Sequence, residues 1–144
     1  MIDEFKLHID RLRASKLRPT QQRLVISKIL FGTSETFHFT IEKLKKMVEK
    51  HTRNQISLAT VYNTVHAFKK NGYIKEISLK SDKSFFDTNT KKHHHFYDED
   101  TGNLIDIENS GISIKKIPSA PFGKKIKEVE IVVRVASNYH NQKK

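Results

Sequence analysis

The sequence predicts an α+β protein in which an N-terminal winged helix-turn-helix is followed by a small α/β domain. Three observations predict this order. Apolar residues recur with helical spacing up to residue 71, a hairpin pattern follows up to residue 86, and a period of two begins near residue 104. The expected boundaries are 1–86 for the winged helix, 87–92 for a hinge and 93–144 for the second domain.

Four helices are expected in the first domain. The first is expected to bury Phe5, Ile9 and Leu12, which are spaced four and three residues apart. The second is expected to open at Pro19-Thr20, and Thr40 and Ser57 are expected to cap the third and the fourth. The third should bury Ile41, Leu44 and Val48, and the fourth Leu58, Val61, Val65 and Phe68.

Strand patterns follow the helices. Ile77 and Leu79 alternate with polar residues, Ser81-Asp82-Lys83 indicates a turn, and Ser84-Phe85-Phe86 returns as the second half of a hairpin. Further strands are expected at Leu104–Ile107 and Val129–Val135, whereas residues 111–123 fit no pattern. Roughly 50 residues with few strands bury little core alone, so a second copy is expected to cover the apolar face as a homodimer.

The charge of the chain is uneven. The 144 residues carry a formal net charge of +11, of which residues 1–85 contribute +9 and residues 86–144 contribute +2. A basic N-terminal half indicates a module that binds nucleic acid. No apolar run reaches the roughly 20 residues that span a bilayer, and the acidic N-terminus is unlike a signal peptide, so a cytoplasmic protein without a membrane partner is expected.

The polar face of the fourth helix suits double-stranded DNA. Its residues are small or hydrogen-bonding, and none is acidic: Thr60, Tyr62, Asn63, Thr64, His66 and Ala67. Such side chains let a helix enter the major groove and reach base edges. Arg18 and Arg23 near the second helix, Lys69 and Lys70, and Lys80 and Lys83 on the wing are expected to meet phosphates or the minor groove.

A cluster of metal-binding residue types lies in the middle of the chain. His93-His94-His95 stand between Asp87 and Asp106, and the chain has no cysteine. A site must therefore use nitrogen and oxygen ligands, and Fe²⁺, Mn²⁺ and Zn²⁺ all accept such a set. In a strand, His93 and His95 point to one side and His94 to the other.

Several motifs are similar to those of the ferric uptake regulator superfamily, and most of all to its iron response regulator branch. The resemblance covers about residues 5–136. The motifs that carry it are Arg18-Pro19-Thr20-Gln21-Gln22-Arg23, Leu58-Ala59-Thr60-Val61-Tyr62-Asn63-Thr64, Phe86-Asp87-Thr88-Asn89, His93-His94-His95-Phe96-Tyr97, and Ile117-Pro118-Ser119-Ala120-Pro121 leading to Ile131-Val132-Val133-Arg134.

The resemblance implies a homodimeric transcription regulator of iron and haem genes, with a metal site shared by both domains. It adds His38 to the metal ligands Asp87, His93, His95 and Asp106, and it implies haem binding at His93, His94 and His95. It also implies that Tyr62 contacts bases and Arg18 the minor groove. With the helix and wing residues above, the candidate DNA contacts are Arg18, Thr20, Arg23, Ala59, Thr60, Tyr62, Asn63 and Lys83.

The chain departs from the family where many members hold a structural zinc with two Cys-x-x-Cys pairs. Asp98 and Thr101 stand at the first pair's positions, so the second domain must rely on apolar packing.

A manganese, zinc or peroxide sensor of the same superfamily would use the same ligands. A non-haem iron enzyme is disfavoured, because two histidines and a carboxylate would need the pocket of a larger barrel. A binder that ignores DNA sequence is a third alternative.

Overall fold

The computed structural model describes residues 3–80 and 82–138 and divides into two compact units, Met1–Thr90 and Lys91–Lys144. The division falls inside the segment 87–92 that the sequence predicts as a hinge. The last residues of the expected second domain, 139–144, lie outside the described residues. None of the helices in the described ranges has both the length and the apolar character that crossing a membrane requires.

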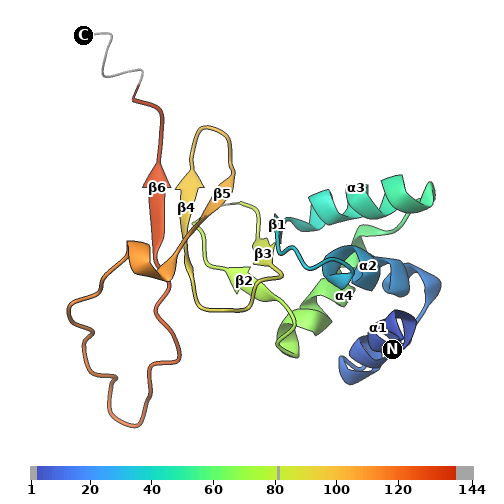
Figure 1. The fold of residues 1–144 in the computed structure, drawn as a ribbon, viewed down its shortest axis with the longest axis horizontal. Coiled ribbons are helices and arrows are strands. Elements are labelled where there is room, and N and C mark those ends of the chain that lie inside the picture. The colour runs from blue at the N-terminus through green and yellow to red at the C-terminus, as the bar shows by residue number, and fades with distance from the viewer. Residues whose placement is uncertain (1–2, 81, 139–144) are drawn as a thin grey trace. The chain divides into compact units, whose positions relative to one another are not determined.

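The N-terminal unit contains the four expected helices (Figure 1). They are α1 (Glu4–Ala14), α2 (Gln21–Phe31), α3 (Ile41–Thr52) and α4 (Leu58–Lys70). Each begins at a side chain that accepts a hydrogen bond from the backbone N–H groups of the first turn: Asp3, Thr20, Thr40 and Ser57. The caps predicted for the third and fourth helices are therefore confirmed, as is the predicted opening of the second helix at Pro19-Thr20.

The buried face of α1 differs from the prediction. Phe5 is 50% exposed, whereas His8 and Leu12 are buried one turn apart and Ile9 is partly buried. Burial of a histidine is favourable here because Ser27 Oγ lies 2.8 Å and Arg11 Nη1 3.1 Å from His8 Nδ1. The pattern of apolar residues alone could not reveal these polar partners.

A small antiparallel sheet forms the wing. Its strands are β1 (His38–Phe39), β2 (Lys75–Ile77) and β3 (Phe85–Asp87), in the order β1-β3-β2. Ile77 lies opposite Phe85, so the predicted hairpin is confirmed. Strand β1 was not predicted, because two residues are too short to show a period. Of the predicted turn, Ser81 lies outside the described residues.

The core of the N-terminal unit joins the helices to the wing. Phe39 and Phe86 are paired across β1 and β3 and are both buried, and Val61, Val65 and Phe68 from α4 are fully buried. Ile41, Leu44 and Val48 are buried on α3 as expected. Leu58 departs from the predicted stripe, being 47% exposed at the first turn of α4. The helices and the wing hairpin thus form one packed body that fixes the position of α4.

The C-terminal unit is a three-stranded mixed sheet. Its strands are β4 (His94–Asp98), β5 (Leu104–Ile107) and β6 (Val132–Val135), in the order β5-β4-β6. Strand β5 matches the prediction, whereas β6 begins three residues later than expected. Between them, Asn109–Gly111 forms a 3₁₀ helix and the rest of the connection is a long loop (Figure 1). Among the described residues of this unit, Ile107 is the one buried hydrophobic side chain.

Candidate metal centre and nucleic-acid interface

The N-terminal unit brings two of the predicted metal ligands together. Antiparallel pairing of β1 with β3 sets His38 opposite Asp87, and His38 Nε2 lies 3.3 Å from Asp87 Oδ2. Asp87 is buried, and its Oδ1 accepts a hydrogen bond of 2.8 Å from the Asn89 N–H. A buried carboxylate requires polar partners of this kind, so the wing holds a preformed imidazole–carboxylate pair.

The C-terminal unit brings the other three predicted ligands together. His93 and His95 lie on the same side of the chain, as the period of a strand predicts, with ring centroids 4.5 Å apart. Pairing of β4 with β5 sets His95 opposite Asp106. Both Nε2 atoms lie 3.3 Å from the same oxygen, Asp106 Oδ1. One donor atom from each of the three residues therefore lies within 4.8 Å of the others.

A backbone contact orients His93 for ligation. Its Nδ1 lies 2.6 Å from the carbonyl oxygen of Lys91, which can only accept, so Nδ1 carries the proton and donates it. The lone pair of the neutral ring is then on Nε2, the atom that faces Asp106. Metal-binding histidines in proteins are usually oriented by such a second hydrogen bond.

The donor spacing in both units fits a divalent ion. Two ligands about 2.1 Å from a common ion are about 3.0 Å apart at an octahedral angle and about 3.4 Å apart at a tetrahedral angle. The three distances of 3.3 Å fall within this range. Imidazole nitrogen with carboxylate oxygen suits Zn²⁺, Mn²⁺ or Fe²⁺, and no thiolate competes, since the chain has no cysteine.

His94 differs from its two neighbours. It is buried, and its Nδ1 accepts a hydrogen bond of 3.1 Å from the N–H of Ile131, just before β6. An Nδ1 that accepts leaves the proton of the neutral ring on Nε2. His94 thus ties β6 to β4, and its Nδ1 lone pair is already engaged.

The exposed face of α4 carries most of the predicted base contacts. Ala59, Tyr62 and Asn63 are exposed, and Tyr62 keeps 49% of its surface accessible. Thr64 was predicted on this face but is fully buried, and its hydroxyl donates to the carbonyl of Thr60. A β-branched threonine satisfies its hydroxyl within the helix in this way and can occupy a core position.

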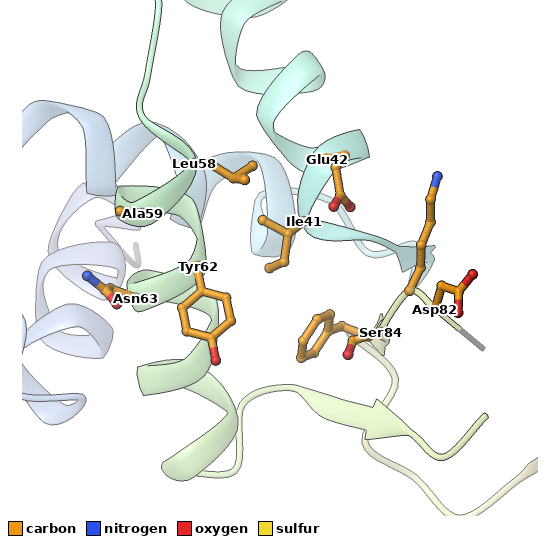
Figure 2. A pocket seen from close by; sticks show the side chains of 10 residues that line it. Ile41, Glu42, Leu58, Ala59, Tyr62, Asn63, Asp82 and Ser84 are labelled. Atoms are coloured by element: carbon orange, nitrogen blue, oxygen red, sulfur yellow. The ribbon is translucent and has the colours of Figure 1, made fainter. Parts of the chain in front are cut away.

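A pocket of about 380 Å³ lies between α4, the start of α3 and the wing (Figure 2). Its lining combines predicted DNA contacts with residues that were not predicted to meet DNA. The predicted contacts are Ala59, Tyr62, Asn63 and Lys83, and the others are Ile41, Glu42, Leu58, Asp82, Ser84 and Phe86. Glu42 could have been found from its position in the first turn of a capped helix, and the same position explains why Leu58 is exposed.

The remaining predicted DNA contacts have mixed surroundings. Arg18 and Lys83 are exposed. Arg23 is half-buried, and its guanidinium donates to the carbonyl of Arg18, 3.1 Å away. Thr20 accepts a hydrogen bond from the N–H of Arg23, so it also serves as the cap of α2. Lys69 is paired with Glu76 at 3.0 Å, which reduces its availability to a phosphate.

The sequence is similar to that of known proteins over most of its length. The profile of the ferric uptake regulator family matches residues 14–134. The peroxide-responsive repressor PerR of Staphylococcus aureus is 33% identical over 105 residues, which cover 73% of this chain and 69% of that protein.

Solved structures are similar over most of the chain. The ferric uptake regulator of Vibrio cholerae has a TM-score of 0.67 at 23% identity, covering 90% of this chain and 98% of that one. The Pseudomonas aeruginosa ferric uptake regulator with manganese has a TM-score of 0.65 at 20% identity, covering 91% and 98%. This similarity confirms the predicted α+β fold, with a helical N-terminal domain and a small α/β C-terminal domain.

Proposed function

The chain belongs to the ferric uptake regulator family, and on that premise we propose that it is an iron-responsive regulator whose DNA affinity is set by metal at its His/Asp donors. Family membership makes it a metal-responsive transcription regulator, and the prediction that it is not an enzyme is confirmed. The choice of iron, the ligand set and the DNA contacts are parts of the proposal.

The observation that carries this proposal is the pair of donor groups, one in each unit. His38 and Asp87 belong to the wing, and His93, His95 and Asp106 to the second sheet. Five residues separate Asp87 from His93, so a chain of at most roughly 20 Å links the two groups. Neither group alone has the four to six ligands that a divalent ion normally takes, whereas five protein ligands together do.

We propose that the two donor groups converge on a single ion. When bound, the ion supplies bonds that hold imidazoles and carboxylates at fixed separations. The residues then fix the angle between the winged helix and the C-terminal sheet. An ion that binds better at one interdomain angle shifts the population of the protein towards that angle. If the ion binds the DNA-competent form more tightly by about 1.4 kcal/mol, DNA affinity rises tenfold.

The C-terminal sheet supports the homodimer in this proposal. Phe96, Ile105 and Val133 are paired across neighbouring strands on one face, and they keep 36%, 52% and 36% of their surfaces exposed. With Ile107 as the one buried hydrophobic residue described there, this sheet lacks a core of its own. A second copy would cover the apolar face and place two copies of α4 for two DNA half-sites.

The ion itself is chosen by availability as well as by the ligands. Imidazole and carboxylate bind Fe²⁺ and Mn²⁺ comparably and Zn²⁺ more tightly, following the usual order of divalent metals. We propose Fe²⁺ as the physiological ion and Mn²⁺ as its stable substitute in solution. Zn²⁺ titration should produce the same DNA-binding form at lower free concentration.

A peroxide sensor is the second candidate, and the relative PerR, described as peroxide-responsive, favours it. Under this alternative, His38 or His93 would be oxidised when Fe²⁺-loaded protein meets hydrogen peroxide. Mass spectrometry of treated protein would detect an added oxygen on one of these histidines. An unmodified protein that keeps its DNA affinity would exclude this candidate.

Haem is the finer signal implied by resemblance to the iron response regulator branch. His93 donates from Nδ1 and keeps a lone pair on Nε2, whereas His94 accepts at Nδ1 and carries its proton on Nε2. We therefore propose that haem is bound through Nε2 of His93 or His95. Haem would then compete with the divalent ion for the same imidazoles. A spectral titration of ferric haem against His93→Ala/His95→Ala protein tests this, and unchanged haem affinity would remove haem from the proposal.

The experiment that tests the main proposal measures DNA binding in parallel for metal-free, Mn²⁺-loaded and haem-loaded protein. Duplexes selected by the Mn²⁺-loaded protein from a random pool serve as probes, with random duplex as competitor. Mn²⁺ should raise specific affinity at least about tenfold. Asp87→Asn should abolish this gain, whereas Asp10→Asn, an exposed aspartate on α1, should leave it unchanged. Equal affinity with and without Mn²⁺ would contradict the proposal, and equal affinity for random duplex would indicate a nonspecific binder.

A further inference from the structure

Two side-chain rings of α4 are in contact with each other. Tyr62 and His66 are four residues apart, one helical turn, and their ring centroids lie 4.1 Å apart with an interplanar angle of 33°. This separation is shorter than the roughly 4.5–7 Å usual for aromatic pairs, so the two rings are in direct contact. His66 therefore limits the orientations that the Tyr62 ring can adopt.

His66 is anchored in turn by the core of the wing. Its ring meets that of Phe86 edge-on, with centroids 5.9 Å apart and an interplanar angle of 77°. Phe86 is fully buried and stacked on Phe39, 5.7 Å away. The imidazole thus joins a half-exposed tyrosine to two phenylalanines that cannot move without disturbing the core.

Tyr62 needs such a support. It is 49% exposed and lines the pocket between α4 and the wing, and Figure 2 shows its ring standing beside that space. A ring that is free in solution loses side-chain entropy when it is immobilised against DNA. A ring already held in place avoids part of this loss.

We propose that His66 is a positioning residue for DNA recognition, holding the Tyr62 ring in its base-contacting orientation against Phe86. The inference rests on the proposed function, because it requires α4 to read bases. His66 acts through Tyr62 and is not itself a base contact: it is half-buried, and its ring lies between Tyr62 and Phe86.

The same packing leads to the metal ligands of the wing. Phe39 follows His38 and Phe86 precedes Asp87, and the β1–β3 register pairs Phe39 with Phe86 beside the pair His38–Asp87. Tyr62 and His66 are therefore connected through the ring of Phe86 to the backbone of β3, the strand that ends at Asp87. A shift of β3 would therefore change the position of the Phe86 ring against which His66 and Tyr62 pack.

The test compares His66→Ala, His66→Phe and the matched control His51→Ala, an exposed histidine on α3. The probes are a duplex selected by wild-type Mn²⁺-loaded protein and a scrambled duplex. His66→Ala should weaken specific binding about threefold to tenfold and change binding to the scrambled duplex by less than about twofold. His66→Phe should restore specific binding because it keeps the stack, and His51→Ala should match wild type.

A second measurement needs neither metal nor DNA. In the proton NMR spectrum of the metal-free 144-residue chain, contacts between the His66 and Tyr62 rings should be present. The Tyr62 ring resonances should shift in His66→Ala but not in His51→Ala. Unchanged Tyr62 resonances would overturn the inference, as would wild-type affinity of His66→Ala for the selected duplex. Failure of the wild-type chain to prefer any duplex would instead refute the proposed function, and the inference with it.

Discussion

The two units of this chain differ in where their cores come from. In the N-terminal unit, helical stripes and the wing bury a continuous cluster that includes Leu12, Leu44, Phe68 and Phe86. In the C-terminal unit, Ile107 is the one hydrophobic residue buried among those described, and the face that carries Phe96 is open. The first unit completes its core within one chain. The second unit leaves the apolar face of its sheet exposed, and a second copy of the chain would cover it. Metal bound by residues of this sheet would then influence both dimer formation and DNA binding.

The largest expected effect breaks the core that the first unit completes alone. Leu44→Ala removes a fully buried side chain and should lower the free energy of unfolding by about 3 kcal/mol. Leu7→Ala, a helical leucine that is 46% exposed, is the matched control and should cost less than about 1 kcal/mol. Urea unfolding of the metal-free protein measures both values. Similar losses for the two variants would show that the assigned core is wrong.

A smaller effect, on the affinity of the proposed dimer, is expected when a charge is placed on the sheet face that carries Phe96. Phe96→Asp should weaken the dimer at least about tenfold, because an aspartate would be buried without a partner in the interface. Phe5→Asp places the same substitution at an exposed phenylalanine of α1 and should leave the dimer unchanged. Sedimentation over a range of concentrations distinguishes them. An undiminished dimer in Phe96→Asp would place the interface elsewhere.

The smallest effect concerns pH and the first unit alone. Burial lowers the pKa of His8, and the nearby Arg11 guanidinium lowers it further. The unfolded chain then binds a proton more readily than the folded one, so stability is present above the unfolded pKa of about 6.5 and is lost as pH falls through the folded pKa. A folded-state pKa that lies 1 below the unfolded value changes the free energy of unfolding by about 1.4 kcal/mol at most.

The matched variants for this pH effect are His8→Gln and His51→Gln. The unfolding free energy of metal-free wild-type protein should fall between pH 7 and pH 5, and His8→Gln should reduce that slope. His51→Gln, at an exposed position, should keep it. A slope that is identical in all three proteins would contradict the role assigned to the buried His8.

The sequence correctly predicted the helices and strands in which apolar residues recur at a regular spacing. It did not predict the polar residues that are buried because another group of the chain forms a hydrogen bond with them. The stripe Val61, Val65 and Phe68 and the three threonine and serine caps follow from rules that act within one helix. His8 and Thr64 were missed as buried residues because their polar groups are satisfied by Ser27 and by a helix carbonyl. No periodicity contains that information.

The candidate site was predictable in composition but not in detail. Two histidines at a spacing of two, flanked by aspartates, indicated Asp106 and His95 as ligands, and strand pairing now brings these two side by side. The protonation of His93 Nδ1 and the engagement of His94 by Ile131 depend on backbone groups, which no pattern of side chains reports. His66 was recognised only as a polar position on α4.

The central claim is that donors of both units hold the same ion, and Mn²⁺ binding by calorimetry tests it most directly. The account predicts one ion per chain, with His38→Ala and His95→Ala each weakening binding at least about tenfold. Because both variants would remove ligands of one site, their losses of binding free energy should not add in the double variant. Two ions per chain, or independent and additive losses from the two substitutions, would contradict the shared site.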